Sequence, residues 1–273
     1  MVLVLPTLAY RETLNNLLAT PGANMGTSVT AHASIHTKGS WTQLIASTTY
    51  DAEWICVAFG PTNVAATQTD SLVDIGIGGS GAETVLIPNL LAGYVGQAVS
   101  ALGRHILLPI KIPKGSRISA RAQSITTAKV VPVAVWVIGG ARHPQFDPTS
   151  RCDAIGVTSS GNSRGTSVTA GNTGTEGSWT SINSPTARSY SALGFLAQGT
   201  LTTHTNLYFH FEVGFNSTAI AEYFVMANTN EQIGGPVPVF PIFHFIPSGT
   251  QLQIRGECSG TAEAMSCALY GMY

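Results

Sequence analysis

Short apolar runs alternate with polar turns along most of the chain, which is typical of β-strands rather than of helices. The runs are rich in Val, Ile and aromatic residues and are bounded by Gly, Pro, Ser and Asn. The clearest are "EWICVAFG" (53–60), "SLVDIGIG" (71–78), "VVPVAVWVIG" (130–139), "NLYFHFEVGF" (206–215) and "SCALYGMY" (266–273). With about six to eight strands in each half, the chain is predicted to be all-β and antiparallel, as a sandwich or barrel. A jelly roll is preferred to an immunoglobulin-like fold.

One segment near the N-terminus has a helical pattern instead. In "TLAYRETLNNLLA" (7–19), Tyr10, Leu14 and Leu18 share one helix face, and "TPG" follows as a stop signal. We therefore expect a short N-terminal helix or arm within residues 1–21. It either packs on the first domain or docks on a neighbouring subunit.

The chain repeats several landmarks in the same order, at offsets of about 132 to 139 residues. The repeated pairs are "GTSVTA" at 26–31 and 165–170, "GSWT" at 39–42 and 177–180, and "DIGIG" at 74–78 opposite "EVGFN" at 212–216. Such agreement indicates a tandem duplication. It predicts a first β-sandwich at 22–140, a second at 160–273, and a Pro-, Ser- and Gly-rich linker at 141–159.

The stretch "DIGIGGSGAE" (74–83) contains Gly76-x-Gly78-x-x-Gly81, the spacing of a dinucleotide-binding loop. That loop needs a helix directly after it, whereas proline and glycine interrupt the residues that follow. The second copy keeps only Gly214. The motif is therefore interpreted as a turn between strands, and no cofactor is expected.

The composition favours a folded structural protein, a subunit of a larger assembly. Charged residues make up 10% of the chain, against roughly 25% in an average soluble domain. No apolar stretch is long enough to span a membrane, and the first residues lack the positive leader of a signal peptide. Four cysteines have no metal-site spacing and are expected to be reduced and buried, although the last two would pair if their strands are neighbours. They are Cys56, Cys152, Cys258 and Cys267.

Candidate catalytic and metal chemistry is sparse. His32 and His36 form HxxxH, but four residues along a strand separates side chains by about 13 Å, too far to share one metal. No G-x-S-x-G nucleophile motif occurs. The carboxylates aligned between the halves are Asp74 with Glu212 and Glu83 with Glu222, which are interpreted as solvating a turn. The chain is therefore expected not to be an enzyme.

Trp41 and Trp179 occupy equivalent places, each in "GSWT". Each either closes one end of a sandwich core or offers an aromatic platform to a sugar ring or a partner subunit. They are predicted as aromatic anchors.

Charge is distributed unevenly between the halves. The first domain carries seven Lys or Arg and five Asp or Glu, a net +2, whereas the second carries three and six, a net −3. We therefore expect the first domain to dock on an acidic surface while the second faces outward. Nucleic acid is a less suitable partner because the charge density is low and aromatics are not interleaved with it. The predicted docking residues are Arg104, Lys111, Lys114, Arg117, Arg121 and Lys129.

A low-charge tandem β-sandwich rich in Thr, Gly and Ala, with a short N-terminal arm, resembles a virion protein of a tailed bacteriophage. It is most similar to the jelly-roll head decoration, or cement, proteins. The resemblance implies a homotrimer, made in the host cytoplasm, that binds the major capsid protein or other virion proteins. The alternative is a tail, baseplate or fibre protein whose sandwich binds a host glycan, since "ANTNEQIGG" (227–235) is a polar loop suited to that. A lectin or hydrolase unrelated to virions stays open as a third class.

Overall fold

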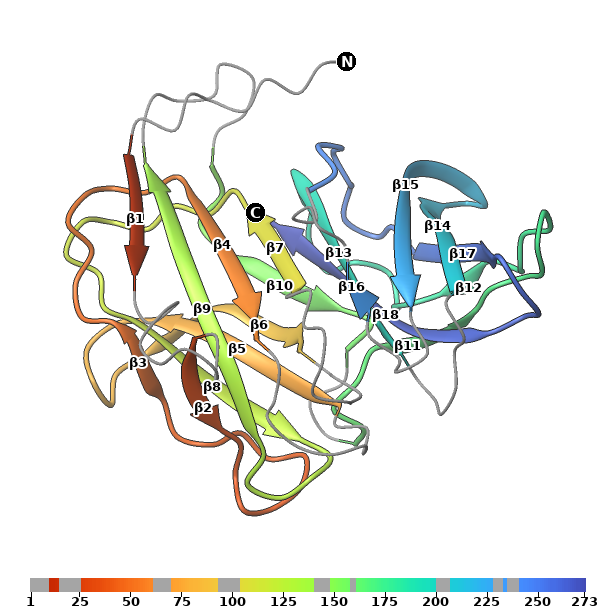
Figure 1. Ribbon diagram of the computed structural model, residues 1–273. Coiled ribbons are helices and arrows are strands. Elements are labelled where there is room, and N and C mark those ends of the chain that lie inside the picture. The colour runs from red at the N-terminus through yellow and green to blue at the C-terminus, as the bar shows by residue number, and fades with distance from the viewer. Residues whose placement is uncertain are drawn as a thin grey trace.

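The computed structural model describes most of the chain as β-strands joined by turns, and no helix forms within the described residues (Figure 1). Accordingly, none of these residues belongs to a helix that would be long and apolar enough to cross a membrane. The described residues are 10–14, 26–60, 70–92, 104–139, 148–157, 161–199, 207–227, 233–234 and 241–273.

The first half of the chain folds into two antiparallel sheets that face each other. The β4 sheet has the order β1-β9-β4-β7, with β2 also paired to β9, and the β5 sheet has the order β3-β8-β5-β6. Their strands are β1 (Tyr10–Leu14), β2 (Thr27–Thr30), β3 (Thr42–Ile45), β4 (Trp54–Phe59), β5 (Ser71–Ile77), β6 (Thr84–Leu91), β7 (Arg104–Leu108), β8 (Ile118–Ser124) and β9 (Val130–Gly139).

The second half forms another pair of sheets, which lies beside the first (Figure 1). In the β13 sheet, β18 pairs with β10, β11 and β13, and the β14 sheet has the order β12-β17-β14-β15-β16. Their strands are β10 (Cys152–Ile155), β11 (Thr166–Thr169), β12 (Thr180–Ser181), β13 (Ala192–Gly199), β14 (Leu207–Phe215), β15 (Thr218–Ala227), β16 (Ile233–Gly234), β17 (Leu252–Cys258) and β18 (Ala264–Met272).

Most strand pairings of the two halves correspond, which confirms the duplicated antiparallel β-sandwich; among the described strands, only β7 and β16 lack a counterpart. Strand β9 pairs with β1, β2 and β4, as β18 pairs with β10, β11 and β13. The order β3-β8-β5-β6 likewise recurs as β12-β17-β14-β15. Within each sandwich, strand residues alternate between the core and the outer face, as in β17, because successive side chains of a strand point to opposite sides.

Two sequence predictions differ from the observed elements. The predicted helix over 7–19 is wrong for Tyr10–Leu14, which form β1 and pair with β9; the rest of that segment lies outside the described residues. The helical spacing is short, and pairing with a long central strand overrides so weak a local preference. The segment 141–159, predicted as a linker, contains β10, which pairs with β18 as β1 pairs with β9.

The two sandwiches share one continuous core. Strands β10, β13 and β18 turn one face toward their own sandwich and the other toward β6 and β7 of the first. Gly194 on β13 lies so close to β7 that an added Cβ would stand 3.1 Å from Leu108 Cδ2. Residues of the second half that belong to the buried cluster of the first are Cys152, Ala192, Leu196, Ala268, Tyr270 and Met272.

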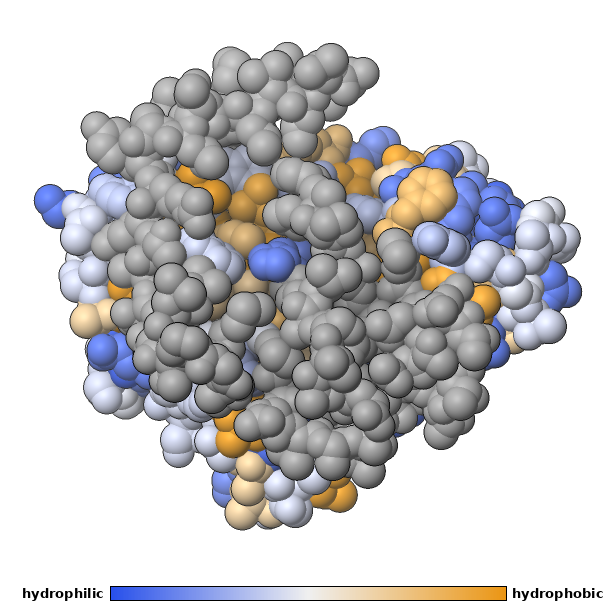
Figure 2. Space-filling model, in the orientation of Figure 1, coloured by the Kyte–Doolittle hydropathy of each residue, from blue (hydrophilic) through white to orange (hydrophobic). Residues whose placement is uncertain are grey.

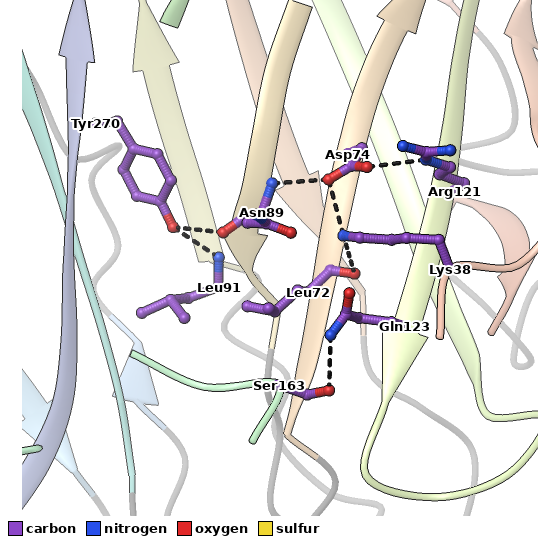
Figure 3. A network of polar contacts seen from close by, with 9 residues as sticks. All are labelled: Lys38, Leu72, Asp74, Asn89, Leu91, Arg121, Gln123, Ser163 and Tyr270. Carbon is purple, nitrogen blue, oxygen red and sulfur yellow. Dashed lines mark hydrogen bonds and ion pairs between the residues drawn. The ribbon is translucent and has the colours of Figure 1, made fainter. Parts of the chain in front are cut away.

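Polar contacts also join the two sandwiches (Figure 3). The hydroxyl of the fully buried Tyr270 accepts a hydrogen bond from Leu91 N at 2.8 Å and donates to Asn89 O at 3.1 Å. The Gln123 amide donates to Ser163 Oγ at 3.0 Å, and Arg164 pairs with Asp70 at 2.6 Å. Because buried polar groups of the two sandwiches bond to each other across the junction, it resembles a domain interior rather than a flexible hinge.

All four cysteines are buried thiols, and none of them forms a disulfide. The pairing considered for Cys258 and Cys267 does not form. Burial raises the pKa of the Cys152 and Cys267 thiols well above the usual value, so neither is a reactive thiolate at neutral pH.

Candidate functional site

A buried carboxylate on the outer face of the β5 sheet binds several neighbouring groups. Asp74, on β5, pairs with Lys38 Nζ at 2.8 Å and with Arg121 Nε at 2.9 Å, and it accepts a hydrogen bond from Asn89 N at 2.8 Å (Figure 3). The side chain of Asp74 is only 4% exposed. Arg121 faces it directly from the neighbouring strand β8. We call Lys38, Trp41, Asp74 and Arg121 the first cluster.

Trp41 is held between this cluster and a glycine. The Arg121 guanidinium lies 4.6 Å from the centre of the Trp41 ring, a cation–π contact. A Cβ on Gly76 would stand 2.7 Å from Trp41 Cη2, so only glycine leaves room for the ring. The glycine of the "DIGIG" motif therefore accommodates an aromatic ring. Gly78 and Gly81 lie at the β5–β6 turn, as expected, with positive φ angles that favour glycine.

The second sandwich repeats this arrangement. Glu212 on β14 lies opposite Arg255 on β17 and accepts a hydrogen bond from its Nε at 2.6 Å. Arg255 lies 4.6 Å from the centre of the Trp179 ring, and a Cβ on Gly214 would stand 3.0 Å from Trp179 Cη2. We call Glu176, Trp179, Glu212 and Arg255 the second cluster.

The two clusters differ in the sign of the charge at one position. Lys38 stands three residues before Trp41, and Glu176 stands three residues before Trp179, where it also pairs with Arg255. The first cluster thus has two cations on one acid, and the second has two acids on one cation. Burial, followed by the nearby Glu212 carboxylate, raises the pKa of Glu176. Burial lowers the pKa of Lys38 despite its partner Asp74.

Replacing Glu176 by Lys recreates the first cluster in the second sandwich and is expected to stabilise the protein. The gain is under about 1 kcal/mol, or roughly 1 to 3 °C in Tm, because Glu176 is partly exposed. In the wild type, the raised pKa of Glu176 means that folding favours its protonated form, so the contribution of Glu176 to stability is present at low pH and is lost as the pH rises through that pKa; the gain from the substitution is therefore larger at high pH. Tm measured from pH 4 to 8 should show that dependence weakened in the variant.

The matched control is Lys38→Glu, which places a second acid beside the buried Asp74. It is expected to lower Tm by several degrees at neutral pH, since it removes one partner of a buried ion pair. If both exchanges shift Tm in the same direction, the two clusters do not respond to charge as their geometry indicates.

The six predicted docking cations do not gather at one place. Arg117 pairs with Glu83 at 2.6 Å, and Arg121 belongs to the first cluster. Lys129 follows β8 while Lys114 precedes it, so they lie at opposite ends of a strand about 20 Å long. Arg104 begins β7, and Lys111 lies beyond its end. Lys111 and Lys114 are exposed, and no ion pair is described for either among the residues placed by the structure.

The aligned carboxylates separate into different roles. Asp74 and Glu212 are equivalent, but Glu83 and Glu222 are not, because Glu222 lies within β15, opposite Glu212, whereas Glu83 lies at the β5–β6 turn. The Arg117 guanidinium holds the pKa of Glu83 below its usual value, chiefly through their hydrogen bond. Glu222 lies 3.3 Å from His210 Nε2. The second acid that pairs with Arg255, besides Glu212, is Glu176. Aligning the two halves does not reveal Glu176, because Lys38 occupies the equivalent position in the first cluster.

The two histidines of HxxxH have separate partners. His32 Nδ1 accepts a hydrogen bond from Ser34 N at 2.9 Å, and His36 Nδ1 lies 2.9 Å from Ser163 Oγ. No group of three or more His, Cys, Asp or Glu side chains that could hold a metal occurs among the described residues.

The geometry assigns the clusters a packing role. In each, an arginine covers one face of the tryptophan and is itself held by a carboxylate, so neither carboxylate is free to act as an acid or base. Each tryptophan packs against the outside of a sheet over a glycine rather than closing the end of a core. The clusters hold the loops that contain "GSWT" on their sheets.

Comparison with known proteins finds neither a matching family model nor a matching curated protein. Among solved structures, the chain is similar to PNGF-II, with 8% identity and a TM-score of 0.37 over 91% of this chain; it spans 65% of that protein's length. It is also similar to PNGase F, a glycosylasparaginase from Flavobacterium meningosepticum, with 10% identity and a TM-score of 0.31, covering 92% and 95% of the two chains.

A viral capsid protein, the STIV MCP, is similar as well, with 8% identity and a TM-score of 0.29 over 97% of this chain and 96% of that one. Because the TM-scores are this low, none of these likenesses bears on function.

Proposed function

We propose that this chain is a non-enzymatic structural protein of a tailed-phage virion, which decorates the capsid as a homotrimer. The observation that carries the proposal is the continuous core across the two sandwiches, with Leu196 and Tyr270 buried against the first. A part that reinforces a shell must transmit load between its contacts without hinging. In this chain, buried apolar contacts and hydrogen bonds join the two sandwiches, and few residues are charged.

The two buried carboxylates support the non-enzymatic part of the proposal. Asp74 is neutralised by Lys38 and Arg121, and Glu212 by Arg255. General acid–base chemistry needs a carboxyl that reaches substrate, and these two are committed to packing contacts.

The capsid-facing surface is proposed to lie at the end of the first domain that carries Lys111 and Lys114. Lys114 stands on a tight turn that is fixed by buried Thr48, whose hydroxyl donates to Pro113 O at 2.8 Å and whose carbonyl accepts from Gly115 N. The second domain repeats this turn at 247–250, with Ser248 in place of the lysine. The exposed cation therefore distinguishes the first domain, and an acidic capsid surface is its proposed partner.

Reversing both charges, in Lys111→Glu with Lys114→Glu, is expected to weaken binding to capsids stripped of this protein by about 100-fold, because like charges placed face to face cost several kcal/mol. Co-sedimentation at low and high salt measures the affinity. Arg117 is left unchanged because its reversal would break the pair with Glu83.

The control is Lys129→Glu, which reverses one charge at the other end of β8. It should bind as the wild type does. Equal binding by the double variant and the wild type would remove this end of the molecule as the docking surface.

A further inference from the structure

Every cation–π contact described in this chain is built in the same way: an arginine lies over an aromatic ring, and a carboxylate holds the guanidinium. Two of these contacts belong to the tryptophan clusters. In the third, Arg188 lies 4.1 Å from the centre of the Tyr273 ring, and its Nε pairs with Asp153 at 3.1 Å. A ring beside a carboxylate is therefore the arrangement with which this chain holds an arginine.

A fourth ring lies beside a carboxylate on the outer face of the β14 sheet, and no arginine of the described residues lies over it. Phe224 and Glu222 stand two residues apart on β15 and point to the same side of the sheet. Phe224 is 78% exposed, and the side chain of Glu222 is 59% exposed. His210 on β14 stacks on Phe224, with ring centres 4.7 Å apart and planes 13° from parallel, and its Nε2 lies 3.3 Å from Glu222. His210 covers one face of the phenyl ring, so the other face is open.

The surface around this ring is acidic. Glu257, on β17, lies opposite His210 on the same face, and no ion pair is described for it within the part of the chain that the structure places. We call Glu222, Phe224 and Glu257 the β15 site, and Figure 2 shows apolar surface over β15 bordered by hydrophilic residues. A cation that docks there gains two carboxylates, whereas an anionic or purely apolar partner would leave them unpaired.

The same place in the first sandwich is a contact surface. There Leu72 and Leu91 lie opposite each other on β5 and β6, as His210 and Phe224 do on β14 and β15. Both leucines are fully buried, and Leu91 N donates a hydrogen bond to the Tyr270 hydroxyl of the second domain. The duplicated fold therefore brings this place into contact in the first half and leaves it open in the second.

The chain also carries an arginine without a ring or a carboxylate. Arg151 is exposed, and among the arginines whose side chains the structure describes it alone has no described ion pair or cation–π contact. It directly precedes β10, and the carbonyl of Thr149, two residues earlier, accepts a hydrogen bond from Lys111 N at 2.8 Å. Arg151 therefore borders the cationic end of the molecule that carries Lys111. It belongs to the β13 sheet, and the core of the second sandwich separates that sheet from the β14 sheet.

We propose that copies of this chain bind one another head to tail, through Arg151 of one copy and the β15 site of the next. In this contact the Arg151 guanidinium lies over the open face of Phe224 and bonds to the Glu222 carboxylate, as Arg188 does with Tyr273 and Asp153 inside the chain. The inference rests on the proposed homotrimer. A homotrimer requires such a contact, because two different surfaces must meet for three copies to close into a ring.

A second copy is the occupant that charge complementarity favours. Arg151 and Lys111 make one end of the molecule cationic, and Glu222 and Glu257 make the β15 site acidic, so identical chains present both halves of the contact. Opposite charges on the two surfaces also fix the orientation in which the copies meet. A cationic surface on a different protein is the other occupant, and the test separates the two.

The test compares the native mass of the full chain, across a dilution series, for the wild type, Arg151→Glu and Glu222→Arg. Each reversal places like charges face to face, so each is expected to weaken self-association by at least about 30-fold. The double variant exchanges the two charges across the contact and should recover at least about tenfold of the lost affinity. Both positions are exposed, so the variants are expected to fold, which circular dichroism checks.

Two further variants separate the ring from the charges. Phe224→Ala removes the ring and keeps both carboxylates, and it is expected to weaken self-association about tenfold, as loss of a cation–π contact in an interface does. Lys129→Glu is the control: it reverses one charge far from Arg151 and from the β15 site, and it should associate as the wild type does.

Mixing the two single variants tests whether both surfaces belong to this chain. Arg151→Glu keeps an intact β15 site and Glu222→Arg keeps an intact Arg151, so an equimolar mixture should associate more tightly than either variant alone. A wild-type oligomer that neither reversal affects would overturn this contact and leave the proposed homotrimer standing. Loss in both single variants without recovery in the double variant would overturn the pairing of Arg151 with Glu222. A wild type that stays monomeric would overturn the inference together with the homotrimer, and loss of capsid binding in Glu222→Arg would then assign the β15 site to a cation of another protein.

Discussion

Replacing Tyr270 by Ala is expected to lower the free energy of unfolding by about 3 to 5 kcal/mol and to uncouple the two sandwiches. Its side chain is fully buried, lies in the core of the first domain, and bonds to Leu91 N and Asn89 O. The cost combines an aromatic-sized cavity with an unpaired backbone N–H. Urea unfolding followed by tryptophan fluorescence and by circular dichroism should show coincident transitions in the wild type and separated ones in the variant.

Two further substitutions serve as controls for Tyr270→Ala. Tyr270→Phe keeps the ring and should cost about 1 to 3 kcal/mol, the penalty for leaving the Leu91 N–H unsatisfied. Tyr208→Ala removes a tyrosine that is 60% exposed and should change stability by no more than about 0.5 kcal/mol. If Tyr270→Ala behaves like Tyr208→Ala, the shared core does not bind the sandwiches together.

Asp74→Ala should be nearly as damaging, with an expected loss of about 3 to 5 kcal/mol. Removing this carboxylate leaves Lys38 and Arg121 facing each other and the Asn89 N–H without its acceptor. Leaving a buried charge without its partner destabilises the fold by more than the intact ion pair stabilises it. Thermal unfolding at neutral pH measures the loss. Without its ion pair to Asp74, Arg121 should cover Trp41 less well, and fluorescence should show that Trp41 is more exposed to solvent.

The equivalent change in the second cluster is the control. Glu212→Ala should cost only about 1 kcal/mol, because Glu176 remains to pair with Arg255. Equal losses at the two sites would show that the exchange of Lys38 for Glu176 has no energetic consequence.

The sequence predicts the duplicated sandwich well because its landmarks are residues that the fold cannot exchange. Gly76 and Gly214 leave room for tryptophan rings, so "DIGIG" and "EVGFN" both retain a glycine at that position. The sequence does not single out the arginines that cover those rings. Arg121 is one of several cations in its segment, and only the β5–β8 register shows that it faces Asp74.

Short strands and non-local contacts explain the other differences. The segment at 7–19 has a helical apolar pattern, yet Tyr10–Leu14 pair with β9, more than a hundred residues away. The shift of register within the β5–β6 and β14–β15 hairpins separates Glu83 from Glu222, which a linear alignment brings together. The contact of Tyr270 with Leu91 joins residues that no local pattern relates.

The contact between the sandwiches indicates how the duplication arose. Its two sides are different surfaces, although the domains that meet there descend from one sequence. An ancestral gene encoding a single sandwich would have given each molecule both surfaces, and such molecules would have joined in succession as separate chains. Fusing two neighbours into one polypeptide fixes their order, removes the entropy of bringing them together, and frees each domain to diverge, as Lys38 and Glu176 have done.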